Sequence, residues 1–266
     1  MLANKRKRMG PLALSIFTLI MLLPIVGIFL NAVATDWAGT VLPEGYTTAW
    51  FVVLINDPRF LTALVNSMIL AIATMAVSAF VCVPAILVAH CYFPALDRLI
   101  GGLVILPYAV PTIVLALGLL RLYSGNYGVR LNGTPWILVL GYIPLGASFY
   151  YIPIKNNLRA IRVTEILEAG YLVGASDFAI LRKIILPSVA RGLVVGLVMN
   201  FTLVISEFVY INLLVGSFFP TMQTFMNLLR TGSGHVTSAL IVVYFVSVWL
   251  ATTIVAMILR SEKETA

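Results

Sequence analysis

The chain has 266 residues, of which 61% are hydrophobic and only 10% charged. Soluble domains carry about 25% charged residues, so this composition excludes an ordinary soluble domain and indicates a lipid bilayer as the solvent. The formal charge of +7 does not indicate nucleic-acid binding, because the basic residues lie at the ends of apolar segments and form no single basic face.

Six apolar segments are long enough to cross a bilayer, which takes about 20 helical residues. They cover about residues 11–33, 61–89, 100–120, 136–154, 192–215 and 236–259. We therefore predict an all-α integral membrane protein with six transmembrane helices, in which residues 1–266 form a single transmembrane domain.

Lysine and arginine predict the orientation, because they concentrate in cytoplasmic loops. With the N-terminus inside, four basic residues face outward, namely Arg59, Arg121, Arg130 and Arg230. The other thirteen of the 17 face inward: Lys5, Arg6, Lys7, Arg8, Arg98, Lys155, Arg159, Arg162, Arg182, Lys183, Arg191, Arg260 and Lys263. Both termini and the loop of residues 155–191 are therefore expected in the cytoplasm.

The first apolar segment and the outer loop that follows it each have two interpretations. The first apolar run follows Lys5–Arg8 like a signal peptide, but it is longer than the roughly 7–15 apolar residues of such peptides, so we expect it to remain as a span. The aromatic-rich loop of residues 35–60 suits either an anchor at the lipid headgroups or a docking surface for an external partner.

The cytoplasmic loop predicts two short helices joined by a turn. Thr164 can cap a helix that begins at Glu165, and Ser176 can cap a second helix. Gly174 permits a tight turn between them. Leu186–Pro187 is expected to end the second helix and direct the chain into the fifth span.

The same loop resembles the cytoplasmic signature of the membrane-spanning subunits of ATP-binding cassette (ABC) importers, Glu-Ala-Ala-x3-Gly-x9-Ile-x-Leu-Pro. Every fixed position matches except the second alanine, which is Gly170 here. The resemblance implies that a short coupling helix docks into a groove on the ATPase through Glu168, Ala169, Gly170 and Gly174. It also implies that Ile184, Leu186 and Pro187 fix the loop to the membrane domain.

The resemblance further implies the partners and the reaction. We expect a permease subunit in the bacterial inner membrane that forms half of a channel and works by ATP-driven alternating access. Its partners would be a cytoplasmic ATPase dimer, an extracytoplasmic solute-binding protein and a second permease, a different chain in preference to a second copy. The chain has no Gly-x4-Gly-Lys-Ser/Thr sequence, so ATP and Mg²⁺ are expected on the partner ATPase.

A polar stripe in the fifth span predicts contact with the solute. Glu207 is the acidic residue within the predicted spans, and ionisable groups at membrane depth usually face a cavity or a partner. Asn200 lies two turns below on nearly the same face, and Ser206 and Tyr210 lie on an adjoining one. The alternative is that Glu207 holds helices together.

Two prolines interrupt the third span at Leu106-Pro107-Tyr108-Ala109-Val110-Pro111. Each removes a helical hydrogen bond, so we predict a kink at Pro107 and Pro111 that serves as a gate or is static, with Tyr108 beside the solute pathway. The Leu-Pro-x3-Pro run is similar to the importer branch for spermidine/putrescine, 2-aminoethylphosphonate, ferric ion and sulfate. Asn66–Ser67 and Leu131–Thr134 fit the same branch.

That branch suggests a polyamine as the solute, with an aminophosphonate second. No catalytic set or metal-ligand cluster is recognisable, since His90 and His235 stand alone, and Cys82 and Cys91 are expected to stay reduced. We therefore expect a translocation subunit and no enzyme. The alternative is an ATP-independent channel or secondary transporter with six spans.

Overall fold

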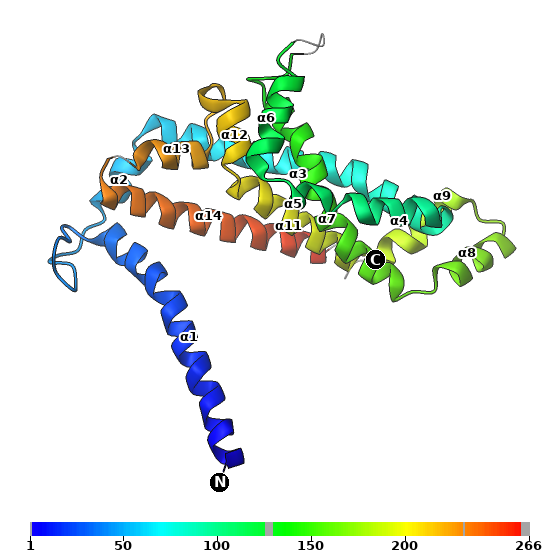
Figure 1. Cartoon of the computed structure of the whole chain (residues 1–266), viewed down its shortest axis with the longest axis horizontal. Helices are drawn as coiled ribbons and strands as arrows, with labels where there is room; N and C mark the ends of the chain where they lie inside the picture. The colour runs from blue at the N-terminus through cyan, green and yellow to red at the C-terminus, as the bar shows by residue number, and fades with distance from the viewer. Residues whose placement is uncertain (1, 126–129, 231, 262–266) are drawn as a thin grey trace. The chain divides into compact units, whose positions relative to one another are not determined.

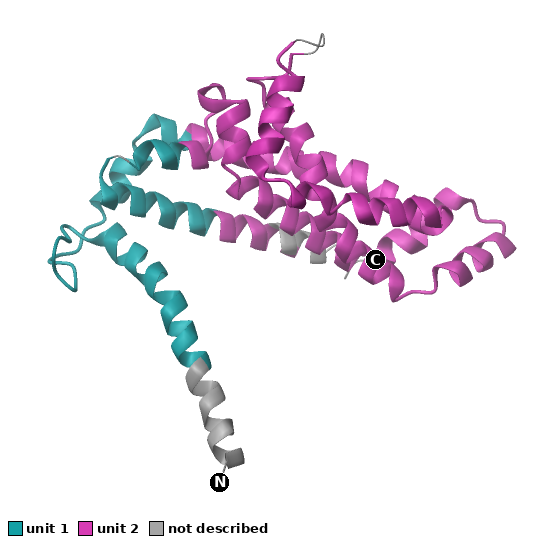
Figure 2. Cartoon of the chain, in the orientation of Figure 1, with its two compact units in different colours: residues 1–61, 225–247 teal, residues 62–224, 248–266 magenta. Residues whose placement is uncertain are grey.

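The structure is a computed structural model, and it describes residues 2–125, 130–230 and 232–261. Their regular structure is helical, apart from isolated bridges that pair Ala34 with Tyr46 and Ser124 with Arg130. The chain divides into two compact units, residues 1–61 with 225–247 and residues 62–224 with 248–266, which are coloured separately in Figure 2.

Figure 1 labels most of the helices along the chain. In order they are α1 Leu2–Val33, α2 Ala49–Ile55, α3 Pro58–Tyr92, α4 Pro94–Leu103, α5 Leu106–Ala109, α6 Thr112–Leu122, α7 Pro135–Arg159, α8 Val163–Leu172, α9 Asp177–Ile180, the π-helix Leu181–Ile185, α10 Leu186–Ser188, α11 Ala190–Ser206, α12 Val209–Leu214, the 3-10 turn Gly216–Phe218, α13 Met222–Leu229 and α14 Gly234–Ser261.

Four unbroken helices among the described residues are long and apolar enough to cross a membrane, and they lie in α1, α3, α7 and α14. The predicted third and fifth spans are not single helices. In the third, Pro94–Ala109 and Thr112–Leu122 meet at a bend of 100°. In the fifth, α11 ends at Ser206 and α12 begins at Val209. A further bend of 71° lies before the fifth span, between Asp177–Ser188 and Ala190–Ser206. By length and composition, the fold therefore contains up to six spans if each bent pair counts as one.

In the smaller unit, the end of α1 packs against α2 and the start of α14. The Asn31 amide donates to the Ser238 hydroxyl at 2.7 Å, and the Trp50 ring stacks on His235 with 5.3 Å between centroids. The Trp50 indole donates to the Ala34 carbonyl. Trp50 of the 35–60 loop is therefore held against α1 and α14, which is compatible with both interpretations of that loop.

In the larger unit, α11 packs along α7 through small residues spaced four apart. A Cβ at Gly192 would meet the Pro153 carbonyl oxygen at 2.5 Å, and one at Gly196 would meet the Phe149 oxygen at 2.8 Å. Pro153 has no N–H to donate to the Phe149 carbonyl. Glycines at these two positions allow the two backbones to approach closely, as in other small-residue contacts between membrane helices.

A hydrophobic core lies where α3, α7 and the 163–189 segment meet. It includes the fully buried Tyr150 and Ile154 of α7, with Ile180, Ile185 and Val189. The cytoplasmic loop predicted from sequence is therefore packed directly onto α7, the helix that precedes it.

Candidate functional site

The first loop helix, α8, starts earlier than predicted. It begins at Val163 with Arg162 as the N-cap residue, and no side chain caps it. The predicted Thr164 cap is wrong, because Thr164 lies inside the first turn. Arg162 instead forms a surface ion pair with Glu165 at 2.9 Å.

The turn after α8 confirms two local predictions. Gly174 has a φ of +76°, which favours glycine, and the Ala175 N–H donates to the Gly170 carbonyl at 2.9 Å. Ser176 is the N-cap of α9, and its hydroxyl accepts from the Ala179 N–H at 3.4 Å. The turn thus folds α9 back against α8.

Gly170 is small for an internal reason. It is buried, and a Cβ there would meet Cδ1 of Ile180 at 2.5 Å. Glu168 and Ala169, by contrast, point to the outside. The substitution of the family's second alanine by Gly170 therefore lets α9 pack more closely on α8 and leaves the outer face unchanged.

An apolar tip surrounds the turn. Leu172, Val173 and Phe178 expose 88%, 82% and 69% of their surface, which together is a large exposed apolar area for one turn. Beside them, the Tyr171 hydroxyl donates to Asp177 at 2.7 Å. The pKa of Tyr171 is raised, chiefly because this hydrogen bond favours the protonated phenol.

The end of the loop differs from the predicted stop at Leu186–Pro187. Pro187 cannot donate to the carbonyl four residues earlier, and residues Leu181–Ile185 adopt π-helical bonding just before it. The helix then continues to Ser188, and the bend follows at Val189. Ile185 and Val189 are buried, whereas Ile184 is 42% exposed.

Glu207 lies at a break between α11 and α12. Its Oε1 accepts from the Val209 N–H at 2.8 Å, and its Oε2 accepts from the Tyr210 N–H at 2.8 Å and from the Tyr142 hydroxyl at 2.9 Å. The carboxylate thus caps the first turn of α12 and ties it to α7. Residues 192–215 were predicted as one helix, and the role of Tyr142 was missed, because a glutamate that caps an internal helix has no distinctive spacing.

Tyr210 and Tyr142 stack with 5.4 Å between ring centroids. Tyr210 also lines a cavity of about 440 Å³ whose wall includes Pro107, Leu119, Gly141 and Pro144. Tyr210 therefore both donates its N–H to the Glu207 carboxylate and lines this cavity.

The hydrogen bonds of the Glu207 carboxylate in the described structure involve none of the predicted pathway residues other than Tyr210. Asn200 is fully buried, neither atom of its amide has a hydrogen-bond partner, and its side chain sits where a Cβ on Gly146 would be. Ser206 is exposed and bonds to the Thr202 carbonyl. Tyr108 donates to the Leu145 carbonyl at 2.6 Å and lines a second, apolar cavity of about 330 Å³.

Of the two prolines, Pro111 lies at the predicted kink, and Pro107 does not. Pro111 forces Val110 into an extended conformation (φ −106°, ψ 131°), which separates α5 from α6. Pro107 lies in the first turn of α5, where no N–H is needed.

This arrangement of long, broken and bent helices is that of ABC importer permeases. The fold is similar to a bacterial ABC transporter that imports the acidic polysaccharide alginate, with a TM-score of 0.74, 19% identity and 95% of each chain covered. It is also similar to the MetNI methionine ABC transporter, with a TM-score of 0.62, 16% identity, and 81% of this chain and 98% of that chain covered.

Residues 82–262, more than half of the chain, match the family described as binding-protein-dependent transport system inner membrane component, and the chain belongs to this family. Among curated proteins it is 27% identical over 194 residues to the spermidine/putrescine transport system permease protein PotC of Escherichia coli K12, covering 73% of this chain and 72% of PotC. It is 25% identical over 202 residues to the putative 2-aminoethylphosphonate permease PhnV of Salmonella typhimurium LT2, covering 76% of this chain and 75% of PhnV. The chain is thus a permease subunit of an ABC importer and has both polyamine and aminophosphonate relatives.

Proposed function

We propose that this permease forms half of the channel for a small polar solute, with a polyamine favoured and an aminophosphonate second. It spans the bacterial inner membrane with both termini in the cytoplasm and pairs with a second, different permease chain. A solute-binding protein delivers the solute from outside. A cytoplasmic ATPase dimer, which binds ATP and Mg²⁺, drives alternating access.

The observation that carries the coupling role is the two-sided construction of α8. Gly170 and Leu167 face inward, while Glu168 and Ala169 face outward beside the exposed Leu172, Val173 and Phe178. An exposed carboxylate next to an apolar tip suits docking into a groove on another protein. The rest of the loop is fixed to α7 through Ile180, Ile185 and Val189, so force applied to the tip would reach the spans.

The proposed solute pathway runs past Glu207 and Tyr210 and includes Asn200, Ser206 and Tyr108. The cavity beside Tyr210 supports its first part. Asn200 supports its second part, because a buried amide without a partner is costly and would gain partners wherever the pathway admits water or a polar solute to it. Two relatives named for amine-bearing solutes support the substrate class.

The test is a mild-detergent pull-down of the tagged chain, followed by ATPase and uptake assays in liposomes with candidate binding proteins. We expect an ATPase to copurify and its activity to rise with a binding protein that carries a polyamine. A chain that purifies alone and moves solute without ATP would instead support a channel or secondary transporter.

A matched pair of variants tests the docking face. Glu168→Lys reverses an exposed charge at the proposed contact, whereas Glu165→Lys reverses one on the same helix that pairs only with Arg162 in the described structure. We expect the first variant to lose the ATPase in the pull-down and the second to retain it. Equal retention in both would remove Glu168 from the docking site.

A further inference from the structure

Helices α4 and α5, residues 94–109, form an arm that leads to the break at Val110–Pro111. The arm is attached to α7 at two separate places. One lies at Asp97 near its start, and the other at Tyr108 near its end. The α7 partners, Lys155 and Leu145, are ten residues apart, which is about 15 Å along a helix.

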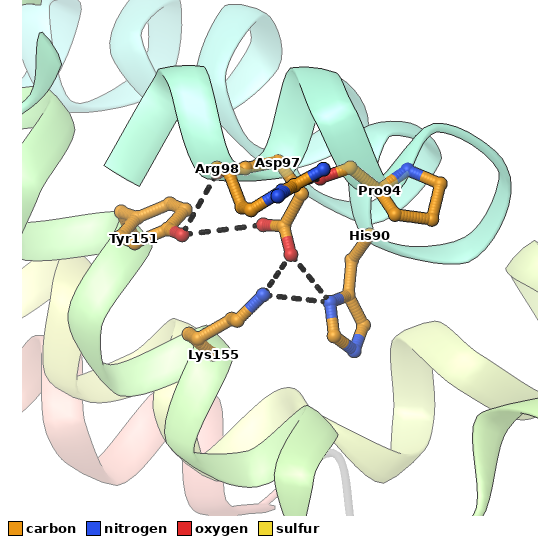
Figure 3. Close-up of polar contacts among 6 residues, drawn as sticks. All are labelled: His90, Pro94, Asp97, Arg98, Tyr151 and Lys155. Atoms are coloured by element: carbon orange, nitrogen blue, oxygen red, sulfur yellow. Dashed lines mark hydrogen bonds and ion pairs between the residues drawn. The ribbon is translucent and has the colours of Figure 1, made fainter. Parts of the chain in front are cut away.

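The first attachment is a buried polar cluster, shown in Figure 3. Lys155 Nζ donates to Asp97 Oδ2 and lies 2.8 Å from His90 Nδ1, and the Tyr151 hydroxyl donates to the Asp97 backbone oxygen at 3.1 Å and to its Oδ1 at 3.2 Å. His90 Nδ1 is also 3.0 Å from Asp97 Oδ2.

The charged groups of this cluster are largely withdrawn from solvent. The side chains of Asp97 and Lys155 are 11% and 12% exposed, and that of His90 is 20% exposed. A buried ion pair adds little to stability compared with apolar residues of the same size, because desolvation offsets the attraction. What it does provide is one fixed geometry between two helices.

The second attachment is weaker, and the space between the two is hollow. Tyr108 donates to the Leu145 carbonyl, and Ser148 donates to the Tyr108 hydroxyl at 3.2 Å. Between the attachments lies the apolar cavity of about 330 Å³, lined by Val104, Ile105, Ser148, Phe149, Ile152 and Met199. Gly101 lies against the Tyr151 side chain, but the arm beyond it, at Val104 and Ile105, borders this cavity and is not packed tightly against α7.

We propose that Asp97 and Lys155, with His90 and Tyr151, form the joint through which α7 moves the arm. Lys155 lies in the last turns of α7, which continues after residues 160–162 into α8. Displacement of α8 would shift Lys155, carry Asp97 with it and swing the arm about the Val110–Pro111 break. This inference rests on the proposed function of α8. Asp97 and Lys155 are positioning residues that do not contact the solute.

The transport test compares Asp97→Asn, Lys155→Met and the double variant in the complete importer. Each single variant leaves one buried group without its partner, so we expect less assembled complex. The double variant removes both charges, so the amount of complex should recover while uptake per ATP hydrolysed stays at least about fivefold low, the lower end of typical coupling between sites. Wild-type uptake per ATP in the double variant would overturn the joint.

Arg98→Gln is the matched control. Arg98 is exposed on the same helix, next to Asp97, and donates only to the Pro94 carbonyl in the described structure. Its replacement removes one charge from the arm without touching the cluster. We expect normal uptake per ATP, and a loss equal to that of the double variant would overturn the assignment of the effect to the joint.

A second readout needs neither ATPase nor solute, so it separates failure of the joint from failure of the proposed function. Spin labels at the exposed positions Leu96 of α4 and Asn156 of α7, with Cys82 and Cys91 replaced by alanine, report the distance between the helices in the purified chain. We expect a narrow distribution in the parent and in Arg98→Gln, and a broader one in the double variant. An equally narrow distribution in the double variant would refute the joint.

Discussion

The two sides of α7 are built differently. On one side, α11 approaches so closely that Gly192 and Gly196 lie against the backbone oxygens of Pro153 and Phe149. On the other side, the arm of residues 94–109 is held by polar contacts at its two ends and has a cavity between them.

The difference indicates which parts move together. Contacts between backbones through glycine leave no room to slide without a clash, so α7 and α11 are expected to move as one body. Polar contacts at two points allow the intervening segment to tilt, because a hollow has few packing contacts to lose. We therefore expect α11 to follow α7 rigidly, whereas the arm of residues 94–109 can tilt relative to α7; we call these the rigid side and the articulated side of α7.

The largest effect is expected at the articulated side. Asp97→Ala leaves the Lys155 ammonium buried without its carboxylate, so the free energy of unfolding should fall by about 3–5 kcal/mol. Graded SDS denaturation of the purified chain measures this. A loss as small as that of an exposed pair would show that water replaces Asp97 there.

On the rigid side, Gly192→Ala and Gly196→Ala should each lower the unfolding free energy by about 1–3 kcal/mol, because the new Cβ would meet a backbone oxygen that cannot rotate away. Gly102→Ala is the control, because no atom lies within 4 Å of the position that its new methyl group would take. It should be neutral or slightly stabilising, as expected for alanine in place of glycine within a helix. Three equal results would contradict the close contact of α7 with α11.

At the end of the contact between α7 and α11, Asn200→Leu should change stability and transport in opposite directions. Removing a buried amide that has no partner should raise the unfolding free energy by about 1–3 kcal/mol, since leucine has the same branched arrangement of heavy atoms without the polar groups. Uptake by the complete importer should fall, since the amide is proposed to meet solute or water in the transport pathway. Unchanged uptake would show that Asn200 takes no part in the solute pathway.

The smallest effect is expected at the second attachment of the arm. Tyr108→Phe removes the hydroxyl bond to the Leu145 carbonyl but keeps the ring, whose edge contacts Phe149 at 6.1 Å between centroids. The unfolding free energy should fall by about 0.5–1.5 kcal/mol. A loss comparable to that of Asp97→Ala would reverse the ranking of the two attachments.

Local chemistry predicted the turn of the loop and the cap of its second helix. The turn at Gly174 and the cap at Ser176 follow from single residues and their immediate neighbours. The docking role that the resemblance implies for Gly170 stays a prediction, and the structure adds that Gly170 makes room for Ile180, ten residues later. The Thr164 cap failed because the helix begins one residue before it.

Hydropathy located the apolar segments but not their shape. It averages over a window, so it does not detect that Glu207 interrupts one segment by capping α12, or that Pro111 turns another by 100°. The prolines predicted a bend without giving its size. Roles of the coupling and pathway residues remain predictions for the experiments above.

The sequence by itself determined that this chain lies in a membrane, where its apolar segments fall and that one loop carries the importer signature, since these properties depend on composition and on spacings within about 20 residues. Only the tertiary structure brought His90, Asp97 and Lys155 together and placed Gly192 and Gly196 against α7. Those contacts join residues far apart in the chain, and neither charge nor glycine content reveals which partner a side chain will meet once the helices pack.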